Sequence, residues 1–174
     1  ILIEKDTKRI LYEKNIDERF LTASIAKILT AITVIENCDL DKWAIIEKDT
    51  INQVGSSIYL KLNDKVKVID LLYGMILRSG NDAALVLAIN TSKTEENFVK
   101  LMNKKAKELN MKNTIFQNSH GLDEVTQNKS TAHDMALLSA YAYKNPIYKE
   151  ISSTNRMDTS RLLELYRALS TFFL

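Results

Sequence analysis

Residues 71–84 read LLYGMILRSGNDAA, and this stretch decides how the middle of the chain folds. Apolar residues dominate its first half, and alanines follow its end. Between them lies Ser79-Gly80-Asn81, in which a glycine stands between two small polar residues that favour turns. We therefore predict two helices, Val68 to Leu77 and Asp82 to Asn90, with Ser79-Gly80-Asn81 in the break between them.

Upstream of these helices, residues 22–27 read TASIAK. Apolar residues at helical spacing predict a helix from Ala23 to Asn37 with one buried face: Ile25, Ile28, Leu29, Ile32 and Ile35. Ser24 and Lys27 lie three apart, so they share one side of this helix, and a neutral Lys27 amine could take the proton of the Ser24 hydroxyl. Taken alone, the pair is more typical of a helix cap followed by a surface lysine.

The remaining pattern predicts a mixed α/β protein. Two short strands, Ile1 to Glu4 and Arg9 to Glu13, form an expected hairpin. Thr131 and Asp134 have the spacing of a capping box that opens a helix. The other expected elements are β-rich stretches at Ala44 to Ile51 and Ser57 to Val68, a helix from about Thr94 to Leu109, and an end to the Thr131 helix before Asn145-Pro146.

Composition excludes several classes of protein. The 174 residues are 45% hydrophobic and 26% charged, with a net charge of +2, which fits an ordinary globular chain and gives no electrostatic case for nucleic acid. No stretch has the roughly 18 to 20 apolar residues that span a bilayer. We therefore expect any membrane attachment, and any targeting signal, to lie in segments outside this chain.

No cofactor or metal is expected. The two histidines, His120 and His133, are too few and too far apart in the sequence for a metal site. Cys38 is the single cysteine, so it forms no internal disulfide, and no histidine stands beside it to activate the thiol. Asp123 is expected to fix its own loop through hydrogen bonds to the backbone.

The order of the motifs resembles that of the serine D-Ala-D-Ala carboxypeptidases, the low-molecular-weight penicillin-binding proteins. TASIAK precedes LLYGM and SGNDAA, and further family-like phrases are GSS (55–57), TIFQNSHGLD (114–123) and STAHDM (130–135). The resemblance extends from the opening hairpin to about Tyr166. It implies a β-lactamase/transpeptidase-like sheet covered by helices, in a single domain over residues 1–174 with an inserted helical region at about 68–145.

The resemblance also implies a mechanism. Ser24 would be the nucleophile, Lys27 its base, Ser79 a proton relay and Asn81 a contact for the substrate amide, while the backbone N–H of Ser24 would donate to the oxyanion. The substrate would be the D-Ala-D-Ala end of a peptidoglycan stem peptide, and β-lactam antibiotics would be covalent inhibitors. Such an enzyme acts outside the cytoplasm, in the bacterial cell envelope.

One family motif is absent from these residues. The family carries Lys-Thr-Gly or a close variant on a strand that follows the helical region, but the last lysine here is Lys149 and the last glycine is Gly121. Residues 161–166 resemble the approach to that strand, and the apolar tail 169–174 departs from the pattern. We therefore expect the C-terminal sheet strands to be missing from this chain and its activity to be impaired.

Two other functions stay open at this point. One is a catalytically inactive domain that binds cell-wall peptide or a protein partner, which the missing motif favours. The other is a class A β-lactamase on the same fold. The second is disfavoured because Gly80 stands where those enzymes carry aspartate, and because no convincing match to their deacylating glutamate loop is present.

Overall fold

The computed structural model describes residues 1–51 and 53–154. The described part contains the α-helices α1 (Lys27–Asn37), α2 (Val68–Arg78), α3 (Asn81–Ser92), α4 (Glu95–Glu108), α5 (Ala132–Ala142) and α6 (Pro146–Ser152). Two short 3-10 turns accompany them, η1 (Ala23–Ala26) directly before α1 and η2 (Lys48–Thr50). The stretch at 161–166, which resembles the approach to the Lys-Thr-Gly strand, and the tail at 169–174 lie outside the described residues.

The strands of the described part form three two-stranded antiparallel sheets. They pair as β1 (Leu2–Ile3) with β2 (Ile10–Tyr12), β3 (Phe20–Leu21) with β6 (Lys129–Ser130), and β4 (Trp43–Ile45) with β5 (Lys65–Lys67). The predicted mixture of strands and helices is therefore present, with small separate sheets in these residues. Strand β3 of the β3–β6 pair leads directly into the segment that holds Ser24.

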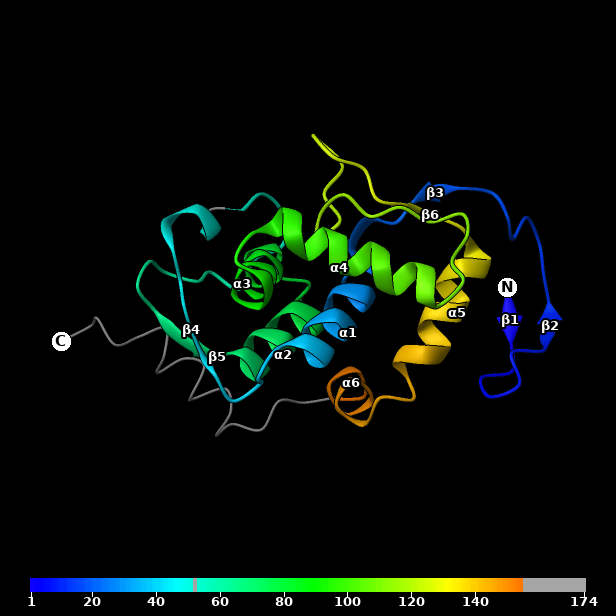
Figure 1. Ribbon diagram of the computed structural model, residues 1–174, viewed down its shortest axis with the longest axis horizontal. Helices are drawn as coiled ribbons and strands as arrows, with labels where there is room; N and C mark the ends of the chain where they lie inside the picture. Colours follow the sequence, from blue (N-terminus) through cyan, green and yellow to red (C-terminus); the bar gives the residue numbers. More distant parts are fainter. Residues whose placement is uncertain (52, 155–174) are drawn as a thin grey trace.

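Helix α1 lies at the centre of the molecule and contacts α2, α3, α4, α5 and α6 (Figure 1). Its sequence explains this position, since Leu29, Ala31, Ile32 and Val34 are fully buried and point in several directions around the helix axis. Helix α3 is buried over its first eight residues, 81–88. These two helices bring the start of α1 and the start of α3 together in the interior.

Local sequence signals account for several helix ends. The Thr94 side chain accepts a hydrogen bond from the Asn97 amide at the start of α4, and Thr131 accepts one from the Asp134 amide at the start of α5, as the capping-box spacing predicts. Asn145 caps α6, and Pro146 occupies its first turn, where a missing N–H does no harm. Helix α6 has only seven residues and was not predicted from the sequence.

Three details of the sequence prediction are wrong. The β-rich stretch at Ala44 to Ile51 is a strand only at its start, in β4, and Lys48–Thr50 forms the 3-10 turn η2. Ile25 is 51% exposed, because it lies in the 3-10 turn η1, before the regular helical stripe begins. Residues 57–62 do not form a strand; the backbone amides of Ile58 and Leu60 instead donate to the side chain of Asp82 in α3. The N-terminal hairpin, the two helices around Ser79-Gly80-Asn81 and the helix near 94–109 are confirmed.

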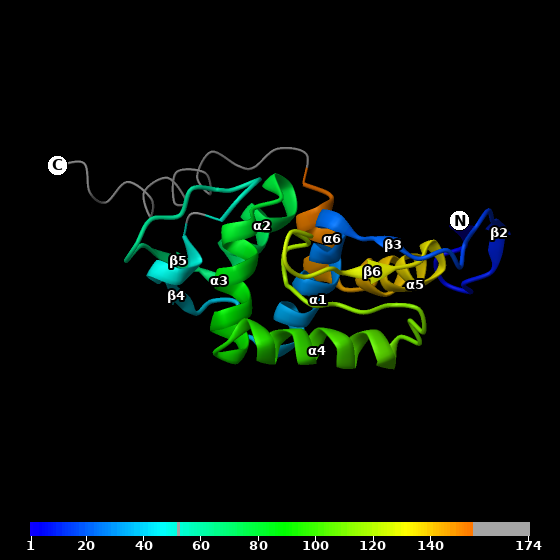
Figure 2. The same ribbon diagram turned by 90° about the horizontal axis from the view of Figure 1, so that it is seen from above.

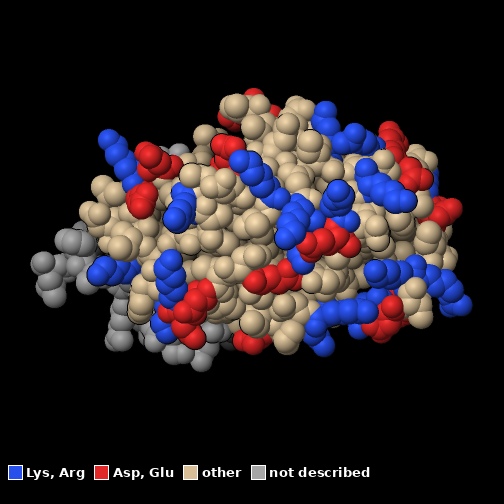
Figure 3. Space-filling model, viewed as in Figure 1, with Lys and Arg blue, Asp and Glu red and all other residues tan. Residues whose placement is uncertain are grey.

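Seen from above, the β1–β2 hairpin and the β4–β5 pair lie at opposite ends, with the helices between them (Figure 2). Lys, Arg, Asp and Glu side chains are interspersed over the face drawn in Figure 3, without a patch of one sign. No helix within residues 1–51 and 53–154 is long and apolar enough to cross a bilayer.

Candidate active site

Ser24 and Lys27 lie where η1 passes into α1. Ser24 is exposed, whereas Lys27 is only 3% exposed, although the two are three residues apart. Lys27 Nζ lies 3.2 Å from Ser24 Oγ, within hydrogen-bond distance. A solvent-facing hydroxyl is thus directly connected to a buried amine, so the cap-and-surface-lysine alternative does not describe this pair.

The Ser79-Gly80-Asn81 turn completes the cluster. Ser79 follows the last residue of α2 in the left-handed conformation, with φ of 56°, and its Oγ donates to Ser24 Oγ at 3.0 Å. Asn81 begins α3 and is 3% exposed, and its Oδ1 accepts from Lys27 Nζ at 2.8 Å. The four residues that the sequence analysis singled out, Ser24, Lys27, Ser79 and Asn81, therefore come together.

The side chain of Asn81 uses both of its polar ends within the protein. Its Oδ1 accepts from Lys27, and its Nδ2 donates to the backbone carbonyl of Val54 at 2.7 Å. In this arrangement Asn81 orients the amine of Lys27. Its role as a substrate contact, which the family resemblance implied, stays a prediction.

Lys27 has a third partner that the sequence analysis missed. Its Nζ donates to the backbone carbonyl oxygen of His120 at 2.5 Å. Burial lowers the pKa of Lys27 to about 8. Two of the polar partners of the amine come from outside its own helix, Asn81 from the start of α3 and His120 from the loop that holds it.

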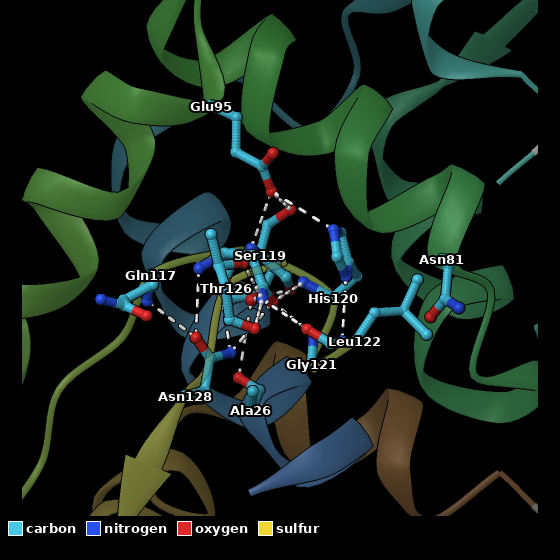
Figure 4. A network of polar contacts seen from close by, with 12 residues as sticks. Ala26, Asn81, Glu95, Gln117, Ser119, His120, Gly121, Leu122, Thr126 and Asn128 are labelled. Carbon is cyan, nitrogen blue, oxygen red and sulfur yellow. Dashed lines mark hydrogen bonds and ion pairs between the residues drawn. The ribbon is translucent and has the colours of Figure 1, made fainter. Parts of the chain in front are cut away.

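That loop, residues 117–128, is held by two buried asparagines, Asn118 and Asn128, of which Asn128 is labelled in Figure 4. Asn118 Oδ1 accepts from the backbone amides of His120 and Gly121, at 3.2 and 2.6 Å. Asn128 Oδ1 accepts from the backbone amides of Gln117 and Asn118, at 2.7 and 3.1 Å. Since Asn128 Nδ2 also donates to Asn118, the two amides form one connected network that fixes the turn around His120.

A carboxylate from α4 supports the same turn. Glu95 Oε1 accepts from the backbone amide and the hydroxyl of Ser119, at 2.8 and 2.6 Å, and lies 3.8 Å from His120 Nε2 (Figure 4). His120 Nδ1 accepts from the Leu122 amide at 3.1 Å, which requires that nitrogen to be unprotonated. Burial lowers the pKa of His120, although Glu95 acts in the opposite direction, and a neutral ring fits this acceptor role.

Glycine is required at position 121 for two reasons. Its φ of 89° lies in the left-handed region, and a Cβ there would collide with the carbonyl group of Ala23, next to Ser24. Ala23 itself has a φ of 44°, which is unusual for a residue with a side chain. Ser24 therefore lies on a constrained turn that packs directly against the 117–128 loop.

The other candidates do not join this cluster as reacting groups. Asp123 was expected to bond to its own loop, but its Oδ1 is buried without a hydrogen-bond partner in the described structure. No group of three or more His, Cys, Asp or Glu side chains in the part of the chain that the structure describes could hold a metal ion.

The comparisons with known proteins agree with this geometry. The model of the Peptidase_S11 family, described as D-alanyl-D-alanine carboxypeptidase, matches residues 1–165. The chain belongs to this family. It is 36% identical over 184 residues to the D-alanyl-D-alanine carboxypeptidase DacF of Bacillus subtilis, covering 95% of this chain and 47% of that protein. It is 40% identical to DacC of Escherichia coli, over 79% of this chain and 37% of the relative.

Solved structures show the same fold. The D-alanyl-D-alanine carboxypeptidase DacD of Francisella tularensis matches with a TM-score of 0.81 and 38% identity, over 86% of this chain and 38% of that one. The S216A mutant of the Streptomyces K15 DD-transpeptidase matches with a TM-score of 0.80 and 33% identity, over 86% of this chain and 62% of that one. The S11 chain thus has the predicted penicillin-binding-protein fold, and it spans less than half the length of the two curated relatives.

Proposed function

We propose that this S11 chain carries the acylation machinery of a serine D,D-carboxypeptidase, which removes the terminal D-alanine from peptidoglycan stem peptides. One observation carries the proposal: the exposed Ser24 Oγ lies 3.2 Å from Lys27 Nζ and 3.0 Å from Ser79 Oγ. A nucleophile, a base and a second hydroxyl within hydrogen-bond reach are what covalent acyl transfer requires.

Acylation begins with Lys27 in its neutral form. With a pKa of about 8, roughly one lysine in ten is neutral at pH 7, enough to act as a general base. The amine takes the Ser24 proton while Oγ bonds to the carbonyl carbon between the two D-alanines. The tetrahedral intermediate collapses when the C–N bond breaks, and the proton passes from Lys27, through Ser79, to the departing amine of D-alanine.

Deacylation repeats the sequence with water. Lys27 accepts a proton from a water molecule, whose oxygen attacks the ester carbonyl, and the proton returns to Ser24 Oγ as the acyl group leaves. The backbone N–H of Ser24 is the proposed donor to the oxyanion in both steps. Asn81 holds the Lys27 amine in place throughout, and a direct contact with the substrate amide is its second proposed role.

The partners follow from the same proposal. They are peptidoglycan stem peptides as substrate and β-lactams as covalent inhibitors that acylate Ser24. The site of action is the bacterial cell envelope. Any attachment to a membrane is assigned to segments outside these 174 residues.

The absent Lys-Thr-Gly motif gives the alternative, an inactive domain that binds peptide or a partner. A second oxyanion donor contributes about 100- to 1,000-fold in rate. We therefore expect this chain to cleave peptide at least about 100-fold more slowly than a version extended through a Lys-Thr-Gly strand. A strained β-lactam can still acylate Ser24, because release of ring strain supplies part of the driving force.

The test is labelling with a fluorescent penicillin, followed by peptide mass spectrometry, with the Ser24→Ala variant as control. We expect one adduct, on the peptide that contains Ser24, and none in the variant. A folded chain that takes up no label would favour the inactive domain. An adduct on another serine would overturn the assignment of the nucleophile, and rapid turnover of the β-lactam would revive the β-lactamase alternative.

A further inference from the structure

The carboxylate of Asp82, the second residue of α3, is buried next to the active site and has no role in the chemistry above. Asp82 is 1% exposed and accepts four hydrogen bonds. Its Oδ2 accepts from Ser57 Oγ at 2.6 Å and from the Leu60 amide at 3.1 Å. Its Oδ1 accepts from the Ile58 amide at 3.1 Å and from the Ala83 amide at 2.9 Å.

Three of these four bonds come from one irregular stretch of chain, residues 54–60, which we name the latch segment. The latch segment contains no helix or strand, so no regular backbone ladder holds it in place. A buried carboxylate at the start of a helix is well placed to hold such a segment, because it accepts N–H and O–H donors and lies at the positive end of the helix dipole.

The latch segment in turn holds Asn81. The carbonyl of Val54 accepts from Asn81 Nδ2 at 2.7 Å, and the carbonyl of Ser56 accepts from the Asn81 backbone amide at 2.8 Å. A carboxamide has one donor end and one acceptor end. Once Nδ2 is bound to Val54, Oδ1 must point the other way, and there it accepts from Lys27 Nζ at 2.8 Å.

We propose that Asp82 is a positioning residue for the reaction: by holding the latch segment, it fixes the orientation of the Asn81 carboxamide and thereby the position of the Lys27 amine. This inference deepens the proposed function, on which it rests. The side chain of Asp82 itself does not touch Ser24 or Lys27 in any hydrogen bond of the described residues. Asp82 acts on Lys27 indirectly, through the hydrogen bond between Val54 and Asn81 and the one between Asn81 and Lys27.

The variant Asp82→Asn tests the proposal with almost no change in volume. All four partners of Asp82 are hydrogen-bond donors. In Asp82→Asn, an NH₂ group replaces one of the accepting oxygens, so two donors face each other and the hydrogen bonds at that position are lost. We expect the latch segment to move and Asn81 Oδ1 to leave Lys27. Labelling by penicillin then slows by about tenfold or more, because the base is no longer held in line with Ser24.

A second readout does not depend on catalysis. The titration of Lys27 is followed by its pH-dependent acetylation with acetic anhydride, read by peptide mass spectrometry. Loss of the Asn81 acceptor removes a hydrogen bond that favours the ammonium, so the pKa of Lys27 moves lower in Asp82→Asn and also in Asn81→Ala. If the parent chain takes up no penicillin, the proposed function fails, but this titration still decides the role of Asp82.

A double-mutant cycle separates positioning from general stability. In the Asn81→Ala background, Asp82→Asn should cause no further change in the Lys27 titration, since its route of action is already gone. The matched control is Asp134→Asn, which removes another buried helix-start carboxylate that binds a loop, through Asn113 and Thr114. The control should lower the melting temperature and leave the Lys27 titration unchanged.

Two results would overturn the proposal: an unchanged Lys27 titration in folded Asp82→Asn, or additive effects of the two substitutions. If Asp82→Asn does not fold, Ser57→Ala takes its place in the cycle. That change removes the 2.6 Å contact with Asp82, together with the acceptor of the Tyr59 amide within the same segment. It should move the titration in the same direction by a smaller amount, and a folded Ser57→Ala with no shift counts equally against the proposal.

Discussion

The Lys27 amine donates to the backbone carbonyl oxygen of His120, 93 positions further along the chain, at 2.5 Å. Its other partners, Ser24 Oγ and Asn81 Oδ1, are also uncharged. Lys105 offers a contrast within the same protein: partial burial acts to lower its pKa, but the carboxylates of Glu108 and Glu36 raise it. Neutral acceptors hold Lys27 in place without the carboxylate that would keep it permanently charged.

The first prediction concerns the pH dependence of acylation. Because the pKa of Lys27 is about 8, its neutral fraction rises steeply between pH 6 and 8 and is nearly complete above pH 9. We expect the rate of penicillin labelling to follow this rise, about tenfold per pH unit below the midpoint. A rate that is flat from pH 6 to 9 would show that proton transfer to Lys27 is not part of the slow step.

The second prediction concerns stability. The pKa of Lys27 is lowered from 10.5 to about 8 on folding, so between these values the unfolded chain binds more protons and the free energy of unfolding rises with pH. Below pH 8 the ammonium therefore destabilises the fold, by roughly 3 kcal/mol at most. Urea unfolding measures the free energy of unfolding of the wild-type chain and of Lys27→Met. The difference between these two free energies should change between pH 8 and 10.5 and should be constant below pH 8.

In that comparison, a difference in the free energy of unfolding that is the same at every pH says nothing about the titration of Lys27. Methionine leaves Asn81 Oδ1 and the His120 carbonyl without their donor, which lowers the stability of the variant at every pH. Only the slope of the unfolding free energy against pH reports the titration of Lys27. Equal slopes for the two proteins would mean that Lys27 has the same pKa in the folded and unfolded chains.

The third prediction tests the base directly with Lys27→Arg. A guanidinium does not lose its proton in proteins, so labelling of Ser24 should disappear. Lys27 is buried, so the larger arginine should also cost about 1 to 3 kcal/mol of stability. Circular dichroism before the assay establishes that the variant is folded. An arginine variant that is labelled at the wild-type rate would rule out Lys27 as the base.

A fourth prediction separates activity from stability at Ser79. This residue has a φ of 56°, a conformation that glycine adopts without strain, and its Oγ donates to Ser24. We expect Ser79→Gly to be as stable as the wild-type chain or up to about 1 kcal/mol more stable, and to be labelled about 100-fold more slowly. Ser79→Ala, which keeps the strain, should lose the same activity without the gain in melting temperature.

Sequence reasoning was most successful where a local pattern and a motif coincide. Ser24 and Lys27 lie three residues apart where η1 passes into α1, and Ser79 and Asn81 flank one glycine, so each pair could be placed from spacing alone. The proximity of the two pairs came from the family resemblance, since nothing local connects α1 with the α2–α3 break. The helix periodicity also misassigned Ile25, because the first turn is a 3-10 turn and the stripe of α1 begins after it.

The supporting residues were missed for a different reason. His120 acts through its backbone carbonyl, which carries no signature in its side chain. Asp82, Glu95 and Asn128 bind backbone groups that are distant in sequence, whereas Asn118 binds the nearby amides of its own turn, and all four residue types are common at surfaces. The available signal was position in a motif, since Asp82 lies within SGNDAA and Asn118 within TIFQNSHGLD. Their contacts nevertheless depend on tertiary packing, which a motif does not reveal.

The last prediction concerns Gly121, where the 117–128 loop meets the turn that holds Ser24. In Gly121→Ala the new methyl group would meet the carbonyl of Ala23, which is backbone and cannot swing aside, and the φ of 89° adds strain. We expect a loss of several kcal/mol in stability, or a displaced loop, and labelling reduced at least about 100-fold because the contact of His120 with Lys27 is lost.

Gly55→Ala is the matched control. Gly55 has a similar φ of 82°, but the nearest atom to its added Cβ is the side-chain nitrogen of Asn81 at 3.1 Å. It should therefore show the backbone strain with a weaker clash, and lose clearly less stability. Equal losses in the two variants, measured by urea unfolding, would mean that the positive φ alone explains the glycine at position 121, and that the contact with Ala23 does not constrain the nucleophile.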